Sequence, residues 1–132
     1  MSSTDDGAAP SLSATELRRR LDADEPVRLL DVRNRDEVEA WSIPADDRVT
    51  VPYMQFVAAG ATGEVEALAA DNGLDDGTEL VVVCAEGEAS DEVAASLRSI
   101  GVDATNLAEG MAGWARLYES AVISESPRIV QY

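Results

Sequence analysis

Short apolar runs alternate along this chain with segments in which apolar residues recur at helical spacing. The short runs predict strands, of which the third is almost continuously apolar and therefore buried on both faces: 27–32 (VRLLDV), 48–51 (RVTV), 79–84 (ELVVVC) and 103–108 (DATNLA). The segments between them predict helices over 14–21, 35–41, 90–101 and 111–120, and helical stretches over 53–60 and 62–70 broken at Gly60 and Gly63. This alternation predicts an α/β fold, an open and mainly parallel sheet with helices on both faces.

Two of the predicted helices carry signals at their ends. Ser13 and Glu16 have the spacing of a capping box, which places a helix start beside Ser13. Gly101 suits the residue after the last turn of the helix over 90–101, and Ser90 suits the N-cap of that helix. Ser90 therefore has a structural explanation that needs no catalytic role.

The chain ends differ in composition from the middle. Residues 1–11 are small and polar, which predicts a disordered N-terminal lead, and residues 12–119 are expected to form one domain. The tail over 120–132 closes with an apolar, strand-like piece (RIVQY). We expect this tail to be either an extra edge strand or the junction to a further domain.

The charge of the chain is strongly negative, with 26 Asp and Glu residues, no lysine among its ten basic residues and a net charge of -16. Such a surface argues against binding to nucleic acid or to an anionic membrane, because both need basic residues. The composition resembles that of proteins from extremely halophilic archaea, and an ordinary acidic protein is the alternative. The N-terminus lacks a signal peptide and no apolar run has membrane length, so a soluble, cytoplasmic protein is expected.

The chain has one cysteine and no histidine, which excludes an internal disulfide and ordinary zinc, copper or haem sites. We therefore expect no metal and no cofactor. Cys84 ends the most apolar predicted strand, at the edge where parallel α/β sheets bind their ligands. By itself this position fits a nucleophile, and it also fits a small buried apolar side chain.

Three segments, taken in order, resemble the rhodanese domain family. The segment over 29–46 (LLDVRNRDEVEAWSIPAD) looks like its first signature. The segment over 81–107 looks like its cysteine strand, active-site loop, helix and following strand, and 107–114 (LAEGMAGW) resembles its closing Leu-x-Gly-Gly-x-x-x-Trp pattern, with Met111 taken as the second glycine position. The resemblance covers roughly residues 12–118.

The resemblance implies a five-stranded parallel sheet and a sulfurtransferase, in which Cys84 carries sulfane sulfur as a persulfide. The loop that would surround the sulfur with backbone N–H groups consists of Ala85, Glu86, Gly87, Glu88 and Ala89, followed by Ser90 at the start of the next helix. Asp31 and Arg33 would support the site, although pairing with each other or with Glu37 inside the scaffold is the alternative.

This loop departs from the family pattern in its charge. Members that use thiosulfate usually carry one or two arginines there, whereas this chain has Ala85 and Ala89, with Glu86 and Glu88 close by. We therefore expect weak use of thiosulfate. The arginine that a tyrosine-phosphatase loop requires is replaced by Ser90, which excludes a phosphatase or an arsenate reductase.

Two functions follow from these expectations. The first is a sulfurtransferase, a monomer or weak dimer, whose partners are small sulfur donors and acceptors or a persulfide-bearing protein. The second is a catalytically weak rhodanese-like binding or regulatory module. Such a module would suit the N-terminal part of a fusion with a metallo-β-lactamase-fold hydrolase.

Overall fold

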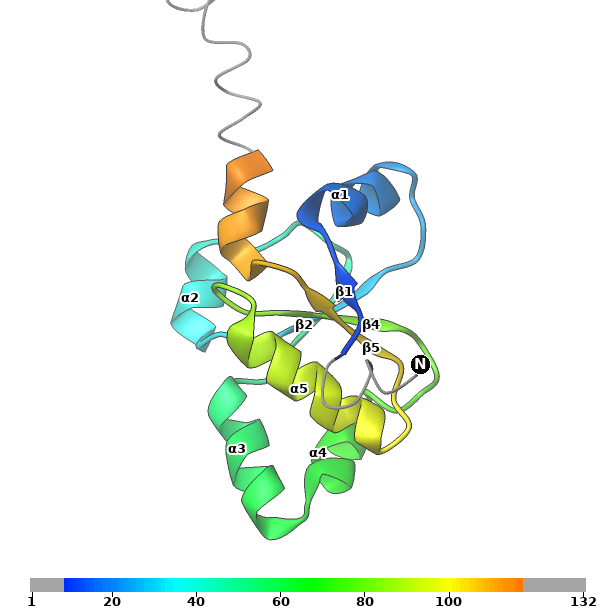
Figure 1. Cartoon of the computed structure of the whole chain (residues 1–132), viewed down its shortest axis with the longest axis vertical. Helices are drawn as coiled ribbons and strands as arrows, with labels where there is room; N and C mark the ends of the chain where they lie inside the picture. The colour runs from blue at the N-terminus through cyan, green and yellow to red at the C-terminus, as the bar shows by residue number, and fades with distance from the viewer. Residues whose placement is uncertain (1–8, 118–132) are drawn as a thin grey trace, which may run out of the picture.

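The computed structural model describes residues 9–117, which fold around a five-stranded sheet (Figure 1). The strands lie in the order β1-β5-β4-β2-β3, and each neighbouring pair is parallel. The strands are β1 (Ser11–Leu12), β2 (Arg28–Asp31), β3 (Asp47–Thr50), β4 (Leu80–Val83) and β5 (Ala104–Leu107). The helices are α1 (Ala14–Asp22), α2 (Arg35–Ala40), α3 (Tyr53–Thr62), α4 (Val65–Asp71) and α5 (Glu88–Ser99), and residues 110–117 are helical as well. The predicted α/β class is confirmed.

The middle strand, β4, is buried along its whole length. Leu80 and Val82 pack into the cluster formed with α3, α4 and α5, whereas Val81 and Val83 pack into the cluster with α1 and residues 110–117 on the other face (Figure 1). This alternation follows from the two-residue period of a strand. Because helices cover both faces, a side chain from the middle of the sheet approaches solvent only at the strand ends.

The edge strand β1 is absent from the sequence prediction, which places residues 1–11 in a disordered lead. That prediction is wrong for residues 9–11. Ala9 is buried, the carbonyl of Pro10 accepts a hydrogen bond from the Asn106 N–H at 2.8 Å, and Ser11 begins β1. The remaining lead, residues 1–8, and the tail over 120–132 lie outside the described residues.

The predicted helix breaks are half correct. α3 continues through Gly60 and ends at Thr62, just before Gly63, whose φ of 72° is the left-handed conformation that favours glycine. Gly60 is accommodated because a single glycine only weakens a helix. The helix over 90–101 in fact begins two residues earlier, at Glu88, and ends before Gly101, which has a φ of 92°.

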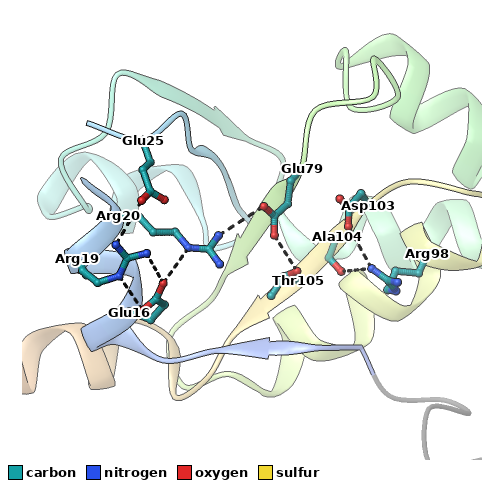
Figure 2. A network of polar contacts seen from close by, with 9 residues as sticks. All are labelled: Glu16, Arg19, Arg20, Glu25, Glu79, Arg98, Asp103, Ala104 and Thr105. Carbon is teal, nitrogen blue, oxygen red and sulfur yellow. Dashed lines mark hydrogen bonds and ion pairs between the residues drawn. The ribbon is translucent and has the colours of Figure 1, made fainter. Parts of the chain in front are cut away.

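Polar contacts attach α1 to the sheet (Figure 2). Ser13 accepts a hydrogen bond from the Glu16 N–H at 3.0 Å, as its capping position predicts, while the Glu16 carboxylate binds Arg19 at 2.7 Å and Arg20 at 3.3 Å. Arg20 also reaches Glu79 at 3.5 Å, just before β4, and Glu79 accepts a hydrogen bond from Thr105 of β5. The network joins α1 to β5 and to the residue before β4, at the edge of the sheet opposite to Cys84.

We expect Glu16 to make the stability of the domain depend on pH in acid. The hydrogen bond from Arg19, joined by that from Arg20, lowers the pKa of Glu16 from 4.5 to about 2. Since the folded pKa lies below the unfolded one, this stabilisation is present above about pH 4.5 and is lost as the pH falls toward 2. Urea unfolding should show E16Q to be less stable than the wild type at pH 6, with the difference closing toward pH 2.

Glu39 of α2 provides the control, because it is exposed and makes no ion pair within residues 9–117. E39Q removes the same charge from the same acidic surface without removing a partner from an arginine. Equal effects of E16Q and E39Q at pH 6 would contradict the assignment.

Within residues 9–117, every helix is too short or too polar to cross a membrane. The same residues include no group of three or more His, Cys, Asp or Glu side chains arranged to hold a metal ion.

Candidate active site

Cys84 lies immediately after β4, at the carboxyl edge of the sheet, with only 6% of its surface exposed. Its carbonyl accepts a hydrogen bond from the Met111 N–H at 2.8 Å, and the carbonyl of Ala85 accepts one from the Ala112 N–H at 2.9 Å. The end of β4 is therefore held by the turn that opens the helical segment over 110–117. The thiol belongs to the apolar cluster that includes Val32, and it also contacts polar groups of Gly87 and Ser90.

Two backbone N–H groups point at the sulfur. The Gly87 N–H donates to Sγ at 3.0 Å and the Ser90 N–H donates at 3.3 Å. Gly87 is the N-cap of α5 and has a φ of 99°, which a residue with a side chain rarely adopts. The amides, together with the N-terminus of a helix, favour negative charge on the atom they face.

Ser90 is not the N-cap that its sequence position suggests. α5 begins at Glu88, so the Ser90 N–H belongs to the first turn, and Cys84 Sγ accepts from it as a capping oxygen would. The Ser90 side chain is fully buried, with Oγ 3.2 Å from Sγ and 2.5 Å from Oδ1 of Asn106. The sulfur thus takes over the capping task and leaves the hydroxyl free for another contact.

The loop between β4 and α5 is shorter than predicted, because Glu88 and Ala89 already belong to the helix. Ala85, Glu86 and Glu88 are exposed and Ala89 is half-buried. Within residues 9–117, neither the Glu86 nor the Glu88 carboxylate makes a hydrogen bond or an ion pair. The rim above the sulfur therefore carries two carboxylates that no arginine of the described residues neutralises.

Asp31 and Arg33 bind each other at the end of β2. The guanidinium makes two contacts with the carboxylate, at 2.8 and 3.0 Å, and also donates to the carbonyl of Trp41 at 2.7 Å. Asp31 is 2% exposed, so the carboxylate is almost fully enclosed by these contacts. Among the described contacts neither side chain touches Cys84, which favours the scaffold interpretation of this pair.

The closing turn contains a residue that the sequence comparison misplaced. The left-handed residues there are Glu109, with a φ of 64°, and Gly110, with a φ of 54°. Counting back from Trp114, Glu109 and Gly110 occupy the two glycine positions of the pattern, and Met111 lies outside it. Glu109 thus adopts a conformation that favours glycine, and its carboxylate is bound by Arg116.

Asn106 is the site residue that the sequence did not predict. It lies in β5 with 6% of its surface exposed, and it reaches Cys84 through Ser90. An amide inside a short, otherwise buried strand is a signal of a polar partner, because buried amides are almost always hydrogen-bonded. The strand pattern does not reveal which partner that is.

Comparisons with known proteins agree on one family. The model of the rhodanese-like domain matches residues 13–117. The chain is similar to YrkF of Bacillus subtilis, named a putative sulfur carrier protein, with 30% identity over 114 residues that cover 86% of this chain and 55% of the relative. It therefore spans about half of that relative's length.

Solved structures give the same result. The human single-domain sulfurtransferase TSTD1 is 31% identical, with 82% of this chain and 96% of that one covered and a TM-score of 0.59. A rhodanese-like domain protein from Staphylococcus aureus is 27% identical, with 80% and 90% covered and a TM-score of 0.61.

Proposed function

Because this chain belongs to the rhodanese-like domain family, we propose that it transfers sulfane sulfur, which it carries as a persulfide on Cys84. Its relatives support a role in sulfur transfer. The observation that carries the proposal is the pair of amides, from Gly87 and Ser90, that donate to Sγ at the start of α5. Donors of this kind stabilise a sulfur that gains negative charge during a reaction.

The proposed reaction has two balanced steps. The thiol of Cys84 first loses its proton to solvent, and the thiolate attacks the outer sulfur of a donor. A new S–S bond forms on Cys84 while the donor's S–S bond breaks, and the donor leaves with the electron pair as a thiolate or, from thiosulfate, as sulfite. An acceptor thiolate then attacks the outer sulfur of the persulfide and restores the Cys84 thiolate. No external oxidant or reductant is required.

The preferred sulfur donor follows from the negative charge of the rim, that is, of the loop residues Glu86 and Glu88 beside Cys84. Glu86 and Glu88 are exposed and unneutralised within the described residues, so they repel a dianion such as thiosulfate. We propose that a persulfide carried by a small molecule or by a protein partner is the better donor, with weak use of thiosulfate. We propose that the chain acts as a monomer or weak dimer, and that its working domain includes the edge strand β1, which begins at Ser11.

We also propose that the protein works at high salt in a reducing cytoplasm. The support for high salt is a net charge of -16 without any lysine, as in proteins of extreme halophiles. At about 1 M salt the Debye length falls to about 3 Å, so the acidic surface repels itself and an anionic substrate much less. A reducing compartment suits a lone thiol that must stay free for transfer.

Mass spectrometry of the intact protein tests the proposed function directly. After incubation with polysulfide in molar KCl, we expect the wild type to gain the mass of one sulfur atom, and a thiol acceptor to remove it. C84S should gain nothing, which assigns the adduct because the chain has a single cysteine. A wild type that stays unmodified with polysulfide, thiosulfate and an organic persulfide alike would refute sulfur transfer and favour the binding module instead.

A further inference from the structure

We propose that Ser90 and Asn106 form a reversible hydrogen-bond chain behind Cys84. This hydrogen-bond chain would give the sulfur a matching hydrogen-bond partner in two states, the neutral thiol and the charged sulfur that occurs during sulfur transfer. This inference rests on the proposed function, since it assigns positioning residues to the same reaction.

The hydrogen-bond chain links three elements of the fold. Cys84 follows β4, Ser90 lies in the first turn of α5, and Asn106 lies in β5, which pairs with β4. The distances are 3.2 Å from Sγ to the Ser90 Oγ and 2.5 Å from that oxygen to Oδ1 of Asn106.

Hydrogen-bond donation sets a direction along this chain. The carbonyl oxygen of Asn106 has no hydrogen, so the Ser90 hydroxyl donates its only hydrogen to Oδ1. Toward Cys84 the hydroxyl then offers a lone pair, and the thiol S–H donates to it. This arrangement suits a thiol whose hydrogen is directed at Ser90, while the two amides donate to the sulfur.

The same direction is unfavourable once the sulfur is charged. A thiolate or a substituted sulfur has no hydrogen to donate, so an Oγ lone pair would face a sulfur lone pair. If the amide of Asn106 rotates by half a turn, its NH2 group donates to Oγ, and the hydroxyl becomes free to donate to the sulfur. An asparagine can serve both directions because one end of its amide accepts and the other donates.

Because the Ser90 and Asn106 side chains are buried, the direction of their hydrogen bonds must reverse when the sulfur becomes charged. Ser90 is 0% exposed and Asn106 is 6% exposed, so solvent has little access to replace a missing partner. A buried hydroxyl without a partner is costly, and a donor to a charged atom contributes more than a donor to a neutral one. Ser90 and Asn106 are thus positioning residues. They act on the reacting sulfur by offering it a hydrogen-bond acceptor when it is a thiol and a hydrogen-bond donor when it is charged.

The S–H stretching band in the infrared spectrum tests the resting direction, and with one cysteine in the chain the band is unambiguous. In the wild type we expect the low frequency of a thiol that donates a hydrogen bond. S90A should raise it to the frequency of a thiol without an acceptor, and S90T, which keeps the hydroxyl, should restore it. An unchanged band in S90A would overturn the proposal.

The rate of persulfide formation with polysulfide tests the reversal. A carboxylate accepts hydrogen bonds but cannot donate one, so N106D should keep the low S–H frequency while slowing persulfide formation about tenfold. S90A should also slow the reaction about tenfold, and S90T should recover most of the rate. A wild-type rate in N106D would show that no reversal is needed. If N106D fails to fold, the rates of S90A and S90T decide.

A double-mutant cycle distinguishes two explanations for a slow N106D variant. One is the loss of hydrogen-bond reversal through Ser90, and the other is direct repulsion of the sulfur by the carboxylate that N106D introduces. If that carboxylate acted directly on the sulfur, N106D would slow S90A and the wild type equally. The proposal expects a much smaller effect in the S90A background, and equal effects would overturn it. A wild type that forms no persulfide would refute the proposed function alone, because the infrared measurement would still report the direction of the chain.

Discussion

Replacing Gly110 with alanine is expected to lower the free energy of unfolding by about 3 kcal/mol or more. Gly110 has a φ of 54°, and a Cβ placed there would lie 2.3 Å from the Cys84 carbonyl oxygen and 3.0 Å from backbone atoms of Ala85. Neither neighbour is a flexible side chain that could move aside. The Met111 N–H, one residue further, donates to that same carbonyl at 2.8 Å. Relief of the clash must therefore displace the segment that carries the thiol.

For this reason G110A should impair the site as well as the stability. Urea unfolding measures the first effect, and the rate of persulfide formation under conditions where the variant is still folded measures the second. G60A is the matched control, because nothing lies within 4 Å of a Cβ at Gly60, which lies in the last turn of α3. We expect G60A to gain up to about 1 kcal/mol from helix propensity. A G110A variant within about 0.5 kcal/mol of the wild type would contradict the packing argument.

The sequence predicted the central part of this fold because the information there is local. β4 reads as a buried strand from its own residues, since an uninterrupted apolar run between turns suits a strand covered on both faces. β1 could not be predicted this way. It has two residues, and it exists because β5 offers it backbone partners in the folded chain, with the Ala108 N–H donating to the Leu12 carbonyl at 2.8 Å.

The start of α5 shows why a local signal can mislead near a functional site. Serine is a preferred N-cap, and Ser90 precedes the clear helical periodicity, so the local pattern predicts a helix start there. In the structure the Cys84 sulfur accepts from the Ser90 N–H, and a glycine with a φ of 99° is the N-cap. A contact between residues six positions apart therefore replaces the local rule.

The position of the candidate site in the fold was predictable from the sequence, but the contacts that surround Cys84 were not. Cys84 and Gly87 could be selected from their order along the chain. The contacts of Ser90 with Asn106 and of Gly110 with Cys84 depend on how β5 and the following turn fold back onto β4. Asp31 and Arg33 were recognised from the sequence as a pair that could lie in the scaffold, and the geometry favours the same interpretation.

Removing the two rim carboxylates with E86Q/E88Q is expected to increase the rate of persulfide formation from thiosulfate about thirtyfold at low ionic strength. Across about 8 Å of water, each carboxylate repels a dianion by about 1 kcal/mol, so the pair contributes about 2 kcal/mol. No cation within residues 9–117 pairs with either side chain to offset this repulsion. Reversal of both charges in E86R/E88R should increase the rate further.

Salt provides the internal control for this charge effect. At about 0.15 M salt the Debye length is about 8 Å, so the advantage of E86Q/E88Q should fall to a few-fold, and it should nearly vanish at about 1 M. E66Q/D75N is the matched variant, because it removes two exposed carboxylates from α4 and from the segment before β4, away from the carboxyl edge that carries Cys84.

The salt series also separates two explanations for slow thiosulfate use. If the rim charges limit the reaction, the rate of the wild type should rise with salt more steeply than that of E86Q/E88Q, and the two rates should converge. If the loop instead lacks a group that thiosulfate needs, the glutamine variant should stay slow at every salt concentration. That second result would mean that Ala85 and Ala89, where arginines usually stand in thiosulfate-using relatives, limit the reaction and that the negative charges of Glu86 and Glu88 do not.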